Sequence, residues 1–267
     1  MTALPFALAA LILLLGAWRM RLESAQTERL GKCMTVGDRE LQEDCYGVSQ
    51  QSAGTLLVLA DGMGRKYGGR IASRIAVQTF LDLFQDERTF EKPQYYFRRA
   101  FYAANRAVLD ALEGGRGSAS VAAAVVQGRT LYYAVAGNVK IAVFHGGDLV
   151  PVSEGHTIGV LAKQKYREGN LTKEQALELL QHRRLYNFVG QDGFREIEFF
   201  SQPLPLRAGD SVVLMTDGLY ETLPWRELEQ ELASGQDAQK QALCIIERIN
   251  RSKQPGKDNA GIVIYRC

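Results

Sequence analysis

The sequence predicts an α+β fold in which a largely antiparallel sheet is covered by helices. Three β-like runs follow one another between residues 119 and 145, joined by "GRT" and "GNV", and connections this short are typical of hairpins, not of crossovers. Paired helical stretches at about 69–86 and 93–113 can cover such a sheet. With 267 residues, 46% of them hydrophobic, the chain is long enough to bury a full core.

The elements alternate between short strands and longer helices along the chain. Runs rich in Val, Ile, Tyr and Phe that end at Gly or Asp predict strands at 55–61, 120–127, 130–137, 140–146, 197–202, 211–217 and 260–267. Further helices are predicted at about 172–183, 224–233 and 238–251. In the first helix the stripe formed by Ile71, Ile75, Thr79 and Leu83 indicates an amphipathic face.

The N-terminal segment differs from the rest of the chain in composition. Residues 3–18 carry no charge, and Arg19 and Arg21 follow them. As a helix these 16 residues span about 24 Å, somewhat less than a hydrocarbon core of about 30 Å. The position of the arginines favours an uncleaved single-pass anchor at 1–20, which enters the lipid bilayer of the cell membrane through residues 3–18. A linker at 21–30 and a cytoplasmic domain at 31–267 would follow. A cleaved signal peptide and an apolar helix packed on the domain are the alternatives.

Composition excludes several functions. The 32 Lys and Arg nearly balance the 30 Asp and Glu, so no nucleic-acid partner is expected. Four cysteines without C-x-x-C spacing and three histidines without H-E-x-x-H argue against a zinc site and for reduced thiols.

Acidic residues recur where predicted strands end or begin. Asp61 and Asp217 each end an apolar run and precede a glycine, Glu43 and Asp44 enter an early strand, and Asp258 precedes the last one. Several carboxylates with water hold Mg²⁺ or Mn²⁺, and a glycine after an Asp lets backbone carbonyl and ion approach closely. On residue patterns alone, turn or N-cap roles for these acids stay open.

Over residues 31–267 the chain resembles the metal-dependent protein phosphatases, the type 2C serine/threonine phosphatases, in their bacterial form. The resemblance rests on Arg39 before "QED" at 42–44, "DGMGRKYGGRIAS" at 61–73, "TDG" at 216–218 and "DN" at 258–259. The segment at 155–184, followed by Gly190, is similar to the flap of that family. The resemblance implies two packed, mostly antiparallel sheets flanked by helix pairs, an αββα sandwich.

The resemblance also implies a two-metal site that holds Mn²⁺ or Mg²⁺. Asp61 would bridge the two ions, Asp217 and Asp258 would complete the first, and Glu43 with the carbonyl of Gly62 would hold the second. Such a site activates a water molecule for in-line displacement at phosphorus.

Two further residues receive catalytic roles from the resemblance. Asp44 would orient or deprotonate the attacking water, and Arg39 would bind the phosphate in a bidentate fork. The implied reaction is hydrolysis of phosphoserine and phosphothreonine in proteins that a serine/threonine kinase has phosphorylated.

The chain departs from the family pattern at several positions. Asn138 in "GNVK" stands where an Asp that helps to hold a third ion is usual, and Arg65 stands where a glycine is usual. "GSAS" at 117–120, "GHT" at 155–157 and "DNAG" at 258–261 also differ. A neutral amide is a poor ligand for a dication, so a third site should be weak or absent.

Two alternatives to an active phosphatase remain at this point. A pseudophosphatase with reduced or no turnover would bind phosphoproteins or other partners. A nucleotide-binding loop at "GMGRKYGG" is the weaker alternative, because its glycines fit neither G-x-G-x-x-G nor G-x-x-x-x-G-K-[ST].

Overall fold

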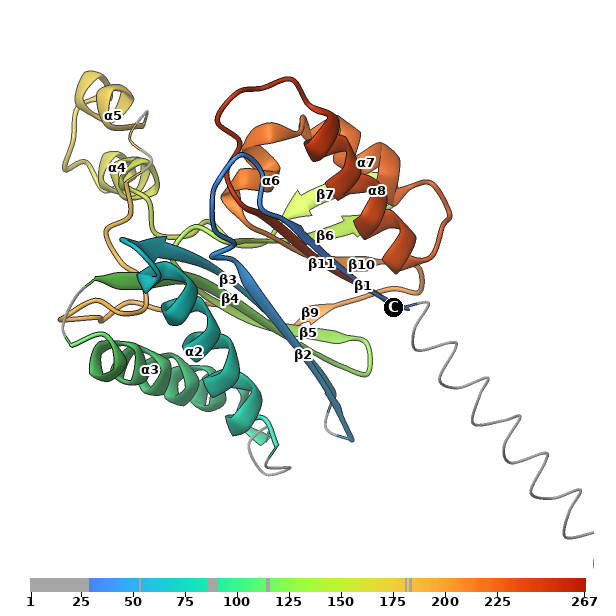
Figure 1. Ribbon diagram of the computed structural model, residues 1–267, viewed down its shortest axis with the longest axis horizontal. Helices are drawn as coiled ribbons and strands as arrows, with labels where there is room; N and C mark the ends of the chain where they lie inside the picture. The colour runs from blue at the N-terminus through green and yellow to red at the C-terminus, as the bar shows by residue number, and fades with distance from the viewer. Residues whose placement is uncertain (1–28, 53, 86–90, 114–115, 181, 183) are drawn as a thin grey trace, which may run out of the picture.

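The structure, a computed structural model, describes residues 29–267 except 53, 86–90, 114–115, 181 and 183. Two antiparallel sheets pack face to face and helices cover their outer faces, which confirms the predicted mixed α+β architecture with two sheets (Figure 1). The predicted anchor at 1–20 and nearly all of the linker lie outside the described residues. Within the described part, no helix is both long and apolar enough to cross a bilayer.

The first sheet joins the two ends of the described chain. Its strands are antiparallel neighbours in the order β1, β11, β10, β6, β7, with bounds Leu30–Thr35, Ala260–Arg266, Ser211–Met215, Lys140–His145 and Asp148–Pro151. Helices α6, α7 and α8 cover its outer face and span Asp217–Thr222, Trp225–Leu232 and Ala238–Arg251.

The second sheet carries the longest strands. Its order is β2, β3, β4, β5, β8, with β9 also paired to β5, and the bounds are Cys45–Gln51, Gly54–Gly64, Gly117–Gln127, Thr130–Ala136, Glu198–Phe199 and Leu204–Pro205. Helices α2 and α3, at Gly68–Leu83 and Pro93–Ala111, pack on its outer face (Figure 1). In the β3–β4 ladder Asp61 stands opposite Ser120 and Gly62 opposite Ala119.

Three apolar layers hold the sandwich together. The middle layer lies between the sheets and includes Leu57, Leu59, Ile141 and Leu214, all fully buried. Because alternate residues of β3 point to opposite faces, Leu56 and Val58 instead join the layer beneath α2 and α3. This explains why β3 reads as a continuous apolar run, since both of its faces are covered.

The flap, residues 155–184, stands apart from the two sheets. It contains α4 at Ile158–Arg167 and α5 at Lys173–Leu180, and it projects from the body in Figure 1. Thr157 caps α4 by accepting a hydrogen bond from the amide of Val160 at 3.2 Å.

Two details differ from the sequence prediction. The buried face of α2 is formed by residues such as Ala72, Ala76 and Phe80, whereas Ile71 is 39% exposed. Small side chains let the helix lie close to β3, so the larger ones move to its flank. Of the strand predicted at 197–202, only β8 pairs with β5. Phe199 pairs with Ala134 and Leu204 pairs with Leu131, so a segment that advances five residues lies opposite one that advances three. The extra residues bulge from the ladder.

Candidate active site

The predicted acidic residues gather at one end of the sandwich, where strands of both sheets terminate. Asp61 ends the apolar run of β3, Asp217 begins α6 directly after β10, and Asp258 precedes β11. Asp44 lies just before β2, and its carboxylate reaches the other sheet, where it accepts a hydrogen bond from Thr216 Oγ1 at 3.0 Å. The fold therefore brings together acids that lie up to 215 residues apart, from Glu43 to Asp258.

These carboxyl groups raise one another's pKa values. Burial, together with the charges of Asp217, Asp258 and Glu43, raises the pKa of Asp44 to about 8. Burial, followed by the charges of Asp44 and Asp217, raises the pKa of Asp61 well above its usual range, although the residue keeps some exposed surface. The cluster thus brings carboxyl groups so close together that each opposes the ionisation of the others.

Two oxygens of the cluster, Glu43 Oε1 and Asp44 Oδ1, are buried and have no hydrogen-bond partner among the residues that the structure describes. A buried charged oxygen without a partner is costly, so this pattern indicates that a cation belongs here. Hard oxygen donors of this kind suit Mg²⁺ or Mn²⁺. Among the residues that the structure describes, no three His, Cys, Asp or Glu side chains are grouped closely enough to hold an ion as they stand.

The two glycines that follow Asp61 and Asp217 each lie against the backbone of another segment. A Cβ on Gly62 would lie 2.3 Å from the carbonyl oxygen of Gly69, and one on Gly218 would lie 2.0 Å from that of Asn259. Each glycine therefore admits a neighbouring backbone, and this close approach holds the strand ends in place.

Three polar residues that received no role from the sequence position the acids. Asn259 accepts a hydrogen bond from the amide of Glu43 at 2.7 Å and donates to the carbonyl oxygens of Val36 and Leu41. Ser73 donates to the carbonyl oxygen of Glu43. Thr216 and Asn259 lie within the "TDG" and "DN" motifs, so the motifs contained a signal for them.

Asn138 lies at the edge of the cluster and both ends of its side-chain amide are engaged. Its Nδ2 donates to Asp217 Oδ2 at 2.9 Å, and its Oδ1 accepts from Ser120 Oγ at 2.7 Å. The backbone carbonyl of Asn138 accepts from the hydroxyl of Tyr220 at 2.9 Å. The amide thus supplies a donor, where an aspartate would supply another negative charge.

Arg39 also reaches the cluster, where its Nη2 forms an ion pair of 2.7 Å with Asp258 Oδ2. The two side chains are 59% and 47% exposed, so solvent weakens the pair. The guanidinium lies at the open rim of the site, from which it can exchange its carboxylate partner for an anion of a ligand.

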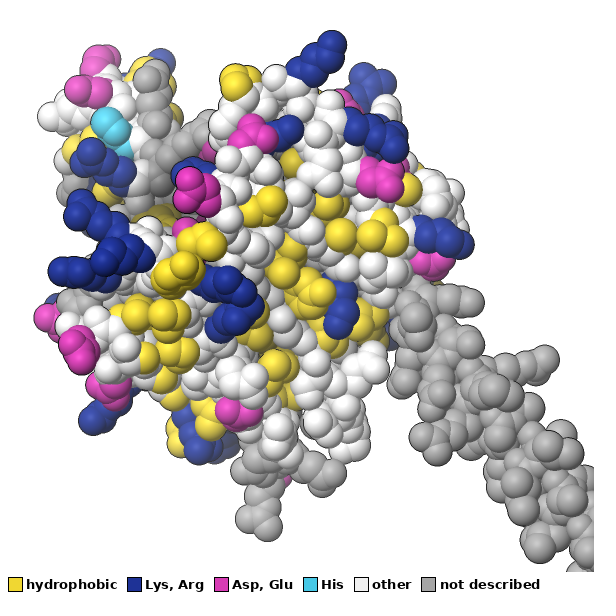
Figure 2. All heavy atoms as spheres, viewed as in Figure 1, with side chains coloured by type: hydrophobic (Ala, Val, Ile, Leu, Met, Phe, Trp, Pro, Cys, Tyr) yellow, Lys and Arg dark blue, Asp and Glu magenta, His cyan; other side chains and the backbone are white. Residues whose placement is uncertain are grey.

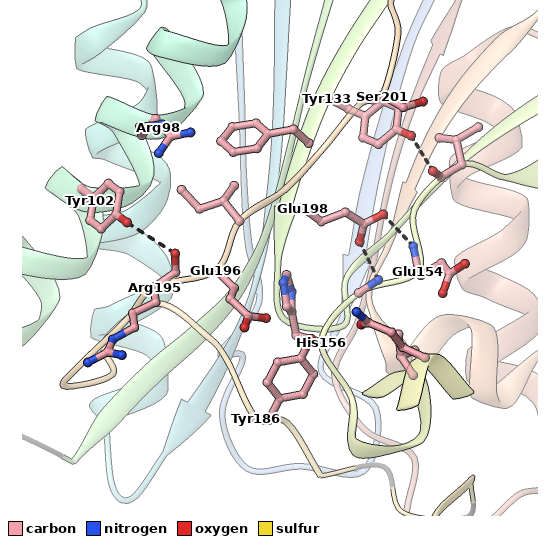
Figure 3. Close-up of a pocket in the computed structure, with 16 residues that line it drawn as sticks. Arg98, Tyr102, Tyr133, Glu154, His156, Tyr186, Arg195, Glu196, Glu198 and Ser201 are labelled. Carbon is pink, nitrogen blue, oxygen red and sulfur yellow. Dashed lines mark hydrogen bonds between the residues drawn. The ribbon is translucent and has the colours of Figure 1, made fainter. Parts of the chain in front are cut away.

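A separate cavity of about 730 Å³ lies between α3, the base of the flap and the edge of the second sheet. Figure 3 shows Glu198 in its wall, accepting from the amides of Glu154 and Gly155 at 2.9 and 2.7 Å. His156 is buried beside Tyr186, and burial lowers its pKa. None of the predicted site residues lines this cavity.

A profile of the protein phosphatase 2C family matches residues 35–243, which is more than three quarters of the chain. The chain belongs to the protein phosphatase 2C family. A serine/threonine phosphatase, Stp, of Listeria monocytogenes is 26% identical over 235 residues, covering 85% of this chain and 90% of the relative. The expectation of a bacterial type 2C serine/threonine phosphatase is therefore confirmed at the level of the family.

Solved structures of phosphatases share the fold. A Streptococcus agalactiae serine/threonine phosphatase superposes with a TM-score of 0.76 at 21% identity, covering 89% of this chain and 99% of the other. The catalytic domain of the phosphatase PstP, solved with two manganese ions, gives a TM-score of 0.68 at 23% identity, with 89% and 97% covered. At these identities the likeness establishes the αββα architecture of this protein phosphatase 2C member.

Proposed function

We propose that this chain hydrolyses phosphoserine and phosphothreonine in proteins at a site that requires two divalent cations. The observation that supports this most directly is the pair of buried, unpartnered oxygens of Glu43 and Asp44 within an acid cluster of a protein phosphatase 2C member. The substrates would be phosphoproteins, and the opposing enzyme a serine/threonine kinase.

The proposed ligands of the cations are Asp61, Asp217 and Asp258 on one side, and Asp61, Glu43 and the carbonyl of Gly62 on the other. Bound Mn²⁺ or Mg²⁺ would supply Lewis acidity, which activates water and neutralises charge on the phosphate. The cations would also remove the repulsion that raises the pKa values of Asp44 and Asp61. The two manganese ions in the structure of PstP support this choice of metal.

Asp44 is well placed to hold a proton from the attacking water. Thr216 donates to its Oδ2, while its Oδ1 has no partner in the described part of the chain and can accept a proton. A pKa of about 8 without metal keeps this carboxyl protonated at neutral pH, and nearby cations would favour its ionised form. Asp44 would therefore become a base only when the cations are bound.

Arg39 would bind the phosphate of the substrate. Its present partner, Asp258, is one of the proposed metal ligands, so metal binding would release the guanidinium at the rim. A planar fork of donors then matches two phosphate oxygens, an arrangement that a lysine cannot reproduce.

We also propose that residues 1–20 anchor the enzyme to the cell membrane as a single span, with the linker at 21–30 and the phosphatase domain, 31–267, in the cytoplasm. The uncharged stretch at 3–18 followed by Arg19 and Arg21 supports this. A reporter that is active only in the cytoplasm, fused to the C-terminus, should be active in membrane fractions. An inactive reporter, or activity only in the soluble fraction, would refute the topology.

The proposed reaction is tested with the full-length chain, p-nitrophenyl phosphate and a phosphothreonine peptide, each with Mn²⁺ or with chelator. Phosphate release should require the metal and should be lost in Asp61→Asn. If wild type shows no metal-dependent rate above this variant, the enzyme reading fails. The engaged amide of Asn138 would then favour a pseudophosphatase that binds phosphoproteins without turnover.

A further inference from the structure

A second cavity, of about 780 Å³, opens next to the acid cluster, at the end of β3 and the start of β4. Three cationic side chains line it, those of Arg65, Lys66 and Arg116. Met63 in its wall pairs with Ser118, two residues beyond Asp61 in the same ladder. At about 3.3 Å per residue, the cavity therefore begins roughly 7 Å along the strand from Asp61.

Close backbone packing brings the cations together from two distant segments. The amide of Arg65 donates to the carbonyl oxygen of Arg116 at 3.2 Å. A Cβ on Gly68 would lie 2.1 Å from that same oxygen, so only glycine permits this approach. Arg65 and Arg116 are thus held side by side at the cavity, 51 residues apart in sequence.

The positive charge of the three side chains is available to a ligand. All three are exposed, and within the described part of the chain no carboxylate forms an ion pair with any of them. Figure 2 shows Lys and Arg side chains gathered at the left of the visible face, where the ends of β3 and β4 meet the base of the flap in Figure 1.

Lys66 adds an independent observation, because its φ of 57° lies in the left-handed region that a residue with a side chain rarely adopts. Backbone strain at a cationic residue beside a candidate active site points to a functional role for that side chain. Arg65 in turn stands where the resembled motif has glycine, so this charge is a feature of this chain.

We propose that Arg65, Lys66 and Arg116 form a subsite for an acidic residue of the phosphoprotein substrate, placed two or three residues from the phosphorylated side chain. The spacing follows from the roughly 7 Å between Asp61 and the start of the cavity, because an extended peptide advances about 3.3 Å per residue. The subsite rests on the proposed phosphatase function and determines which phosphoproteins are preferred. Charged clefts of this kind raise association rates by about ten-fold or more at low salt.

The test measures kcat/KM of the full-length enzyme with Mn²⁺ for three phosphothreonine peptides of equal length. The first has only Ala and Gly around the phosphothreonine. The second carries Glu two and three residues before the phosphothreonine, and the third carries Glu two and three residues after it. One acidic peptide should be preferred over the neutral one by about ten-fold at low salt, with the preference falling as salt rises. Arg65→Gln and Arg116→Gln should each reduce the ratio of kcat/KM for the acidic peptide to kcat/KM for the neutral peptide toward one.

Arg129→Gln is the matched control, since Arg129 is exposed in the turn at the far end of β4, about 30 Å from Arg116. It should leave the ratio unchanged. Equal kcat/KM values for all three peptides, or a preference that survives both test variants, would overturn the subsite but not the phosphatase.

A binding assay separates the two proposals. Fluorescence anisotropy of labelled, unphosphorylated forms of the same peptides reports the subsite without turnover. Weaker binding of either acidic peptide to Arg65→Gln than to wild type supports the subsite even if no peptide is hydrolysed, and that absence of hydrolysis would refute only the enzyme. Equal binding by wild type and Arg65→Gln refutes the subsite.

Discussion

Removal of metal should make the stability of this protein fall as pH rises, opposite to the usual behaviour of carboxylates in folded proteins. Burial raises the pKa of Asp44 from 3.8 to about 8, so between these values the folded chain binds more protons than the unfolded chain. The contribution of Asp44 to the stability of the folded chain is complete below about pH 4 and is lost as pH rises through about 8. The pKa of Asp61 is raised in the same sense.

The window from pH 6.5 to 8 isolates this effect. Burial lowers the pKa of His156 below 6.5, so below pH 6.5 the folded chain binds fewer protons at this residue than the unfolded chain. His156 therefore lowers the stability of the folded chain only below pH 6.5. Over the remaining 1.5 pH units Asp44 alone accounts for about 2 kcal/mol. For a domain of this size that corresponds to a fall in Tm of about 4–8 °C.

The assay is thermal unfolding of the full-length chain at several pH values, with chelator or with Mn²⁺. In chelator Tm should fall from pH 6.5 to 8, and Mn²⁺ at 100 times its Kd should restore about 2.7 kcal/mol per bound ion. Asp44→Asn removes one titrating group, keeps an acceptor for Thr216 and should make the fall of Tm with pH in chelator less steep, whereas Asp192→Asn in an exposed turn should not. A Tm that is constant or rises with pH in chelator would refute the reasoning.

Three further substitutions test separate parts of the site. Asn138→Asp replaces the donor to Asp217 by a charge, so it should lower Tm in chelator and add a third bound Mn²⁺ in a titration; unchanged stoichiometry contradicts this. Gly62→Ala places a Cβ 2.3 Å from a backbone oxygen of α2 and should cost about 3 kcal/mol in denaturant unfolding and abolish metal-dependent turnover; wild-type values would show that the close approach is not required. Glu198→Ala frees two amides at 154–155, whose hydrogen exchange should accelerate; unchanged exchange would mean that the carboxylate does not hold the base of the flap.

Much of the fold could be read from local patterns. The hairpin-length link between β4 and β5 predicted their antiparallel pairing, and the apolar run of β3 predicted a buried strand. The equally short link after β5 was wrongly taken for a hairpin, because it leads to β6 in the other sheet, where β6 pairs with β10 and β7. The pairing of β1 with β11 could not be predicted, because no local signal specifies which distant strand completes a sheet. The buried face of α2 was misplaced by one residue for a related reason, since the depth of packing against β3 selects small side chains.

The candidate site was predictable in its residues but not in its connections. Short motifs identified Glu43, Asp61 and Asp217, whereas their supports depend on long-range geometry. Asn259 reaches the amide of Glu43 across 216 residues, and Thr216 reaches Asp44 across 172. Such contacts appear only once the two sheets are packed together.

The central claim is that the acid cluster holds two divalent cations. Diffraction from crystals of the full-length protein grown with Mn²⁺, with data collected at the manganese absorption edge, locates the ions directly. The account predicts two anomalous peaks, both within coordination distance of Asp61, and none at Asn138. Fewer than two peaks at Asp61, or a third ion held by Asn138, would contradict it.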